Sequence, residues 1–126
     1  MIKDTSLATR VARFVQSADS SKQSFSLQQA DYGGYAKLTK TLLDLILNWL
    51  TETGILLDPV YTGKLAMRLQ EQIKTGEFDS GTSICMIHTG GLQGWRGMQN
   101  QVEQLGGKAA WKTIEQALNR SLAEFK

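Results

Sequence analysis

Apolar positions recur along this chain with two different spacings. Where they return every three to four residues, the pattern is typical of amphipathic helices. It predicts helices over residues 5–17, 38–53, from the turn at Pro59 to Gly76, 95–105 and 108–126. The helix over 38–53 is apolar around much of its circumference, so we expect it to be largely buried and to end at Gly54.

Three short runs do not have helical spacing: FSLQ at 25–28, ILL at 55–57 and ICMI at 84–87. The last run is apolar at every position, as in a strand that is covered on both faces. Such strands, alternating with helices, are typical of a parallel sheet. The pattern therefore predicts an α/β fold, with a partial parallel sheet flanked by helices. We expect a single domain or domain fragment over residues 1–126.

Composition narrows the classes of function. The 126 residues are 41% hydrophobic and 21% charged, which is typical of one globular domain. The net charge is +2 and the basic residues are spread along the chain, so we expect no nucleic-acid partner. No run approaches the roughly 20 apolar residues of a membrane span, and the first fifteen residues lack the apolar core of a secretory signal. These features favour a cytoplasmic protein, in which the single cysteine, Cys85, is a small buried side chain.

Two predicted strands end in residues that could face a ligand. DPVYTGK (58–64) follows ILL, and HTGG (88–91) follows ICMI. Ligands of open α/β sheets bind beyond the carboxyl ends of the strands. Tyr61, Thr62 and Thr89 would supply hydroxyl groups there, and the glycines at 90 and 91 would let the backbone approach a ligand closely.

Each of these residues also has a purely structural interpretation. Thr62 could be a helix N-cap, Asp58 could begin a turn, and His88 could be a buried histidine with its hydrogen bonds satisfied. The sequence contains no second histidine, no cysteine pair and no acidic cluster nearby, so we expect no metal site. Spacing alone assembles no nucleophile and base.

Three stretches together resemble a known family. They are DYGGYAK (31–37), TGILLDPVYTGKLAMRL (53–69) and IHTGGLQGWRG (87–97). In this order and at these separations they resemble the carboxyl-terminal part of the D-cysteine desulfhydrase and 1-aminocyclopropane-1-carboxylate (ACC) deaminase family. The family uses pyridoxal 5′-phosphate and has the tryptophan synthase β-like fold (fold type II). The resemblance is strongest over residues 31–97.

The resemblance implies a role for each matched residue. Thr89 corresponds to the residue beside the pyridine nitrogen, and Tyr61 and Tyr35 correspond to catalytic tyrosines on the substrate side of the ring. The other cofactor-binding positions are Thr62, Gly90 and Gly91. At the positions of Thr62 and Thr89, ACC deaminases carry glutamate and leucine, whereas desulfhydrases carry hydroxyl residues. The resemblance thus implies β-elimination on a small amino acid rather than opening of a cyclopropane ring.

The resemblance also implies what these residues lack. The family's Schiff-base lysine and phosphate loop lie in its amino-terminal part, and neither Lys37, Lys40 nor Lys64 matches that lysine. We therefore expect the carboxyl-terminal portion of a lyase that binds pyridoxal phosphate only within a complete enzyme and is not catalytic alone. Its partners would be the missing amino-terminal portion or a second copy. The alternative is a truncated, non-enzymatic α/β remnant that acts as an oligomerising or partner-binding module, because a sheet cut from its neighbours exposes an edge.

Overall fold

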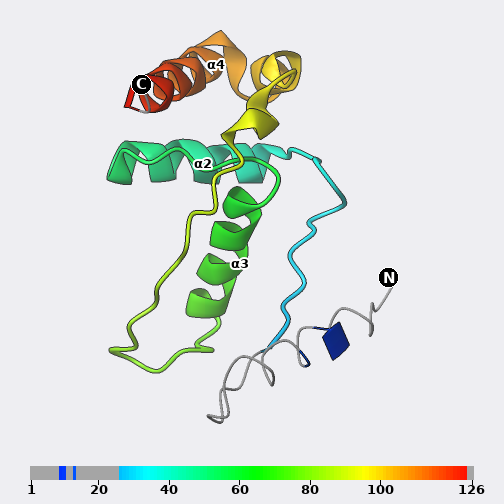
Figure 1. The fold of residues 1–126 in the computed structure, drawn as a ribbon, viewed down its shortest axis with the longest axis vertical. Helices are drawn as coiled ribbons and strands as arrows, with labels where there is room; N and C mark the ends of the chain where they lie inside the picture. The colour runs from blue at the N-terminus through cyan, green and yellow to red at the C-terminus, as the bar shows by residue number, and fades with distance from the viewer. Residues whose placement is uncertain (1–8, 11–12, 14–25, 125–126) are drawn as a thin grey trace.

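The computed structural model describes residues 9–10, 13 and 26–124. Over 26–124 the elements are α2 (Lys40–Thr53), α3 (Thr62–Lys74), the 3-10 helix η1 (Leu92–Trp95) and α4 (Gln99–Glu124). Helix α2 lies between the other two helices, across one end of α3 and beneath α4 (Figure 1). The predicted helix over 5–17 falls almost entirely outside the described residues.

Helix α2 confirms the prediction for residues 38–53. The Thr39 hydroxyl accepts a hydrogen bond from the Leu42 amide (3.2 Å) at its start. Gly54, with φ 74°, ends it, and the Gly54 amide donates to the Leu50 carbonyl. The helix forms the centre of the core, where its buried side chains are Leu42, Leu43, Ile46 and Leu50.

The other helices follow their local signals with small shifts. Helix α3 stops just before Gly76, which adopts the left-handed conformation at φ 73°. The predicted break between the last two helices falls inside α4, where Gly107 leaves the helical conformation (φ 82°, ψ 171°). The segment predicted as helical from residue 95 begins later, at Gln99, because η1 precedes it.

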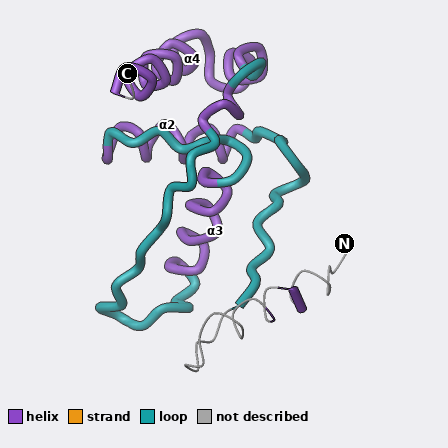
Figure 2. The backbone as a smooth tube through the Cα atoms, in the orientation of Figure 1, coloured by secondary structure: helices purple, strands orange, loops and turns teal. Residues whose placement is uncertain are grey.

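The predicted parallel sheet is wrong. Between residues 26 and 124 the structure contains no β-strand, and the three runs predicted as strands lie in loops where they are described (Figure 2). A strand is stable only when a neighbour satisfies its backbone groups. In the ILL run, side chains take that role instead: His88 and Trp95 contact the carbonyl oxygens of Leu56 and Leu57.

The run at 84–87 is also not the buried strand that was predicted. Ile84 is 42% exposed and Ile87 is 70% exposed, and Cys85, expected to be buried, is exposed as well. No described segment pairs with this run, and within it only Met86 is partly buried and packs against the core. Among the described helices, none is both long and apolar enough to cross a membrane.

Candidate functional site

A buried carboxylate organises the turn that precedes α3. Asp58 is completely buried, and its two oxygens accept hydrogen bonds from the amides of Val60 (2.9 Å), Tyr61 (2.7 Å) and Thr62 (2.8 Å). The Thr62 hydroxyl donates to Asp58 Oδ2 (2.5 Å) and accepts from the Asp58 amide (2.9 Å). Free amides at a helix start favour such a negative group. The interpretation of Asp58 as a turn residue is therefore confirmed, whereas Thr62 is the first residue of α3 and not its N-cap, which is Tyr61. The Thr62 hydroxyl is bound to Asp58 and has no remaining proton to donate to a ligand.

Glycines allow the two motifs to close around this carboxylate. A Cβ atom on Gly63 would lie 2.7 Å from the Asp58 carbonyl oxygen, and one on Gly91 would lie 3.1 Å from Asp58 Cγ. The HTGG turn thus packs directly on the DPVYTGK turn. A Cβ on Gly90, in contrast, would point into open space. Of the two glycines predicted to make room for a ligand, Gly91 makes room for Asp58.

Two side chains connect the HTGG segment to the ILL segment. His88 Nε2 lies 2.9 Å from the Leu56 carbonyl oxygen, and His88 Nδ1 accepts from the Gly90 amide at 3.0 Å. Because Nδ1 is an acceptor, the ring carries its proton on Nε2 and donates it to Leu56. Trp95, which is fully buried, donates from its indole nitrogen to the Leu57 carbonyl oxygen (3.0 Å). His88 is therefore a structural residue with both ring nitrogens hydrogen-bonded, but it is exposed and not buried as predicted.

The two predicted tyrosines lie together. The ring centroids of Tyr35 and Tyr61 are 6.4 Å apart, at an interplanar angle of 66°, which is an edge-to-face arrangement. Both rings are exposed, Tyr35 by 81% and Tyr61 by 60%. Contact with the Tyr35 side-chain hydroxyl, followed by electrostatic repulsion from the same group, raises the pKa of Tyr61 above its usual value.

A third tyrosine supports the turn that carries Tyr35. The Tyr32 hydroxyl donates to the Glu71 carboxylate on α3 at 2.8 Å. Burial, followed by this hydrogen bond, raises the pKa of Tyr32 to about 12. Lys64, on α3, donates to the carbonyl oxygens of Asp31 (2.7 Å) and Gly34 (2.6 Å) in the same turn. The turn is therefore held to α3 from two sides.

Thr89 and Tyr61 line the same cavity. It has a volume of about 330 Å³ and lies between α3 and the segments that precede the two glycine turns, with Thr62, Lys64 and Ile87 also in its wall. The Thr89 side chain is exposed and makes no hydrogen bond to any described residue. Its hydroxyl is consequently free to bind a ligand.

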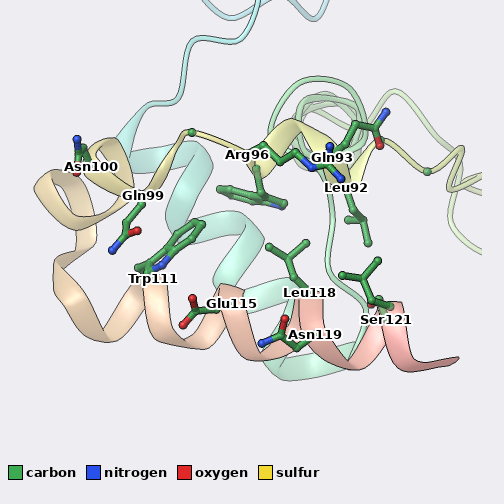
Figure 3. A pocket seen from close by; sticks show the side chains of 15 residues that line it. Leu92, Gln93, Arg96, Gln99, Asn100, Trp111, Glu115, Leu118, Asn119 and Ser121 are labelled. Atoms are coloured by element: carbon green, nitrogen blue, oxygen red, sulfur yellow. The ribbon is translucent and has the colours of Figure 1, made fainter. Parts of the chain in front are cut away.

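Gly90 and Gly91 line a different, larger cavity of about 830 Å³ between η1 and α4. Figure 3 shows Trp111, Glu115 and Leu118 of α4 on one side of this space, with Leu92 and Arg96 on the other. The HTGG turn thus separates two cavities, with Thr89 in the wall of one and its glycines in the wall of the other. The predicted cofactor-binding residues do not all face a single space.

Several important residues were not predicted as functional from the sequence. Lys64, His88 and Trp95 each bind a backbone carbonyl at least 30 positions away. No local pattern shows such a contact. Asp58 had a signal, because an aspartate directly before a proline favours the start of a turn. Within the described residues, no group of three or more His, Cys, Asp and Glu side chains could hold a metal ion.

Comparison with known proteins gives partial matches. The chain is 48% identical over 63 residues to a protein of Pyrococcus abyssi named "Putative 1-aminocyclopropane-1-carboxylate deaminase", covering 50% of this chain and 18% of that protein. A protein of the same name from Pyrococcus furiosus is 40% identical over 73 residues, covering 58% and 22%. The mitochondrial bifunctional D-cysteine desulfhydrase/1-aminocyclopropane-1-carboxylate deaminase of Arabidopsis thaliana is 33% identical over 101 residues, covering 79% and 25%.

The chain thus spans a quarter or less of the length of these three relatives. No protein-family model matches it, and no solved structure is significantly similar to it.

Proposed function

The chain belongs to the family of ACC deaminases and D-cysteine desulfhydrases, and we propose that it supplies one wall of the pyridoxal-phosphate cleft of a lyase of the desulfhydrase type. One observation carries the proposal: the free hydroxyl of Thr89 and the phenol of Tyr61 line one cavity. Tyr35 adds a second phenol at the edge of the Tyr61 ring. Two phenols and a free hydroxyl are suitable partners for a polar heterocycle with an amino-acid substrate beside it.

The residues of the smaller cavity fit one side of the cofactor. Thr89 would hold the pyridine nitrogen, and Ile87 offers an apolar surface to the flat ring. The lysine in this wall cannot be the Schiff-base lysine, because two carbonyl groups already hold the Lys64 ammonium. In a complete enzyme, that lysine and the phosphate-binding groups come from the remaining length of the protein. We therefore expect no catalysis by the chain alone.

The polar groups of the wall favour elimination chemistry. Pyridoxal phosphate, when bound, withdraws electrons from the α-carbon of an amino acid. A neutral threonine favours a protonated pyridine less than a carboxylate would, which suits loss of a good leaving group such as thiolate. Contact with the adjacent Tyr35 raises the pKa of Tyr61 and so makes its phenol a weaker acid. Tyr61 would therefore donate a hydrogen bond to the leaving group rather than remove a proton from the substrate.

The residue before Gly63 indicates the class of substrate. ACC deaminases carry glutamate there, whereas this chain has Thr62, whose hydroxyl is bound to Asp58. That position consequently offers no acid or base to the cavity. A small amino acid with a leaving group on its β-carbon fits this wall better than a cyclopropane.

A titration of the complete lyase that contains this chain with 4′-deoxypyridoxine 5′-phosphate tests the proposal, because this analogue has no aldehyde to react with surface lysines. We expect the NMR signals of Thr89, Ile87 and Tyr61 to move. Thr89→Val should weaken binding about tenfold, which corresponds to one hydrogen bond. Thr113→Val on α4 is the matched control, since its hydroxyl bonds only the Ala109 carbonyl. Shifts confined to the NMR signals of Trp111 and Leu118, which line the larger cavity, would disprove the assignment of the cofactor to the smaller cavity. Unchanged binding by Thr89→Val would disprove the assignment of Thr89.

A second candidate function is an oligomerising or partner-binding module. Ile84 and Ile87 are exposed on a segment in which residues 83–87 make no hydrogen bond with other described residues. An apolar segment with free backbone groups is a template for pairing with another chain. Sedimentation velocity over a range of concentrations tests this function: Ile87→Lys should reduce self-association. A chain that is monomeric at every concentration would contradict self-association and leave the cofactor cleft as the remaining candidate function.

A further inference from the structure

Lys64 is a buried cation without an acidic partner. Only 4% of the residue is exposed, and its ammonium forms no ion pair with a carboxylate in the part of the chain that the structure describes. Its described partners are the carbonyl oxygens of Asp31 and Gly34, at 2.7 and 2.6 Å. Burying an amine is unfavourable unless such bonds compensate it. The two bonds to carbonyl oxygens therefore indicate a specific role for the buried Lys64 ammonium.

The turn that Lys64 binds does not hold its shape through its own bonds. Tyr32 and Ala36 have positive φ angles (46° and 55°), which L-residues with side chains rarely adopt. The backbone bonds within the turn are long, 3.2 Å from the Gly34 amide to Asp31 and 3.4 Å from the Lys37 amide to Gly34. Strained backbone of this kind persists only when its surroundings impose it.

The ammonium links the two tyrosines through their backbones. Tyr35 follows Gly34, whose carbonyl oxygen is bound by Lys64, and Tyr61 precedes Lys64 by three residues at the start of α3. Because Tyr35 is 81% exposed, its own side chain has little packing to fix it. The contact between the two rings therefore depends on the backbone below them.

We propose that Lys64 is a positioning residue: its buried ammonium clamps the turn at 31–36 to α3 and so sets Tyr35 against Tyr61. Its significance for catalysis rests on the proposed function, in which these tyrosines face the substrate. The clamp itself involves neither cofactor nor substrate. Lys64 supplies hydrogen bonds in this arrangement and is not a reactive amine.

The first test follows the Tyr61 ring by NMR in protein with labelled tyrosine rings. Tyr35→Ala gives the reference shift of Tyr61 without its neighbour. Lys64→Met should move the Tyr61 signal to that reference, whereas Lys64→Arg, which keeps donors and charge, should restore at least part of the original shift. Lys74→Met, an exposed lysine at the end of the same helix, should have no effect. An unmoved Tyr61 signal in Lys64→Met would overturn the proposal, provided that the Trp95 indole signal shows an intact core.

The second test needs no variant and so does not depend on whether Lys64→Met folds. Reductive methylation of the unmodified chain, followed by mass spectrometry, measures how accessible each amine is. Lys64 should react at least about tenfold more slowly than Lys74, because the reagent reaches it only when the turn opens. Equal rates would show that no clamp exists. Neither test involves pyridoxal phosphate, so the clamp and the cofactor site can fail independently.

Discussion

Gly91 lies directly against the Asp58 carboxylate: a Cβ atom at Gly91 would stand 3.1 Å from Asp58 Cγ and 3.2 Å from its Oδ2. This contact joins the HTGG turn to the Asp58 turn that precedes α3. It requires a residue without a side chain, and it brings together two motifs that are more than thirty positions apart.

The first prediction compares alanine at the two glycines of this turn. Gly90 and Gly91 have nearly the same φ, 90° and 89°, but a Cβ on Gly90 meets nothing within 4 Å. Both substitutions should lower the free energy of unfolding by about 1 kcal/mol because of the positive φ. Gly91→Ala should cost about 1–2 kcal/mol more, because its Cβ displaces Asp58. Urea unfolding measures both values, and equal losses would contradict the contact.

The second prediction concerns the hydrogen bonds that Asp58 accepts. Asp58→Ala removes the acceptor of three backbone amides and one hydroxyl, so it should lower the free energy of unfolding by about 2–4 kcal/mol. Thr39→Ala, which removes the single cap bond of α2, should cost only about 1 kcal/mol. Thermal or urea unfolding gives the comparison. Similar losses for the two variants would mean that the Asp58 network adds little beyond an ordinary cap.

The third prediction concerns the indole that binds the ILL segment. Trp95→Phe leaves the Leu57 carbonyl without its donor and leaves a void in the core, so it should cost about 2–4 kcal/mol. Trp111→Phe on α4 serves as the control, because Trp111 is half-buried and its indole makes no hydrogen bond with a described residue. That variant should cost about 1 kcal/mol or less. A larger loss for Trp111→Phe than for Trp95→Phe would show that the hydrogen bond from Trp95 to Leu57 does not stabilise the fold.

The fourth prediction is a pH dependence due to Tyr32. Its pKa of about 12 in the folded protein lies above the value of 10.0 expected in the unfolded chain. The stabilisation is complete below pH 10.0. It is lost as the pH rises towards about 12, because the unfolded chain then releases a proton that the folded protein retains. When the pH is raised from below 10.0 to above it, the urea midpoint should therefore fall further for the natural chain than for Tyr32→Phe. An equal fall of the urea midpoint in the two proteins would contradict the raised pKa of Tyr32.

Local sequence patterns predicted the helices well. The apolar spacing of residues 38–53 and the glycines at 54, 76 and 107 mark where helices end, because a helix satisfies its backbone within the segment and its ends depend on nearby residues. The same local patterns failed for the strands. A strand needs a partner from elsewhere in the chain, and the apolar runs at 55–57 and 84–87 do not specify one.

For the candidate site, the sequence determined which chemical groups are present and which family they resemble. Hydroxyls at 61, 62 and 89 and glycines at 90 and 91 stand in the motifs that carry the resemblance. Only the tertiary structure decided how each group is used. It commits the Thr62 hydroxyl to Asp58, leaves the Thr89 hydroxyl without a hydrogen bond to any described residue, and turns Gly91 away from the cavity that Thr89 lines. These assignments depend on hydrogen bonds and close contacts between distant residues, and the chain must fold before such contacts exist.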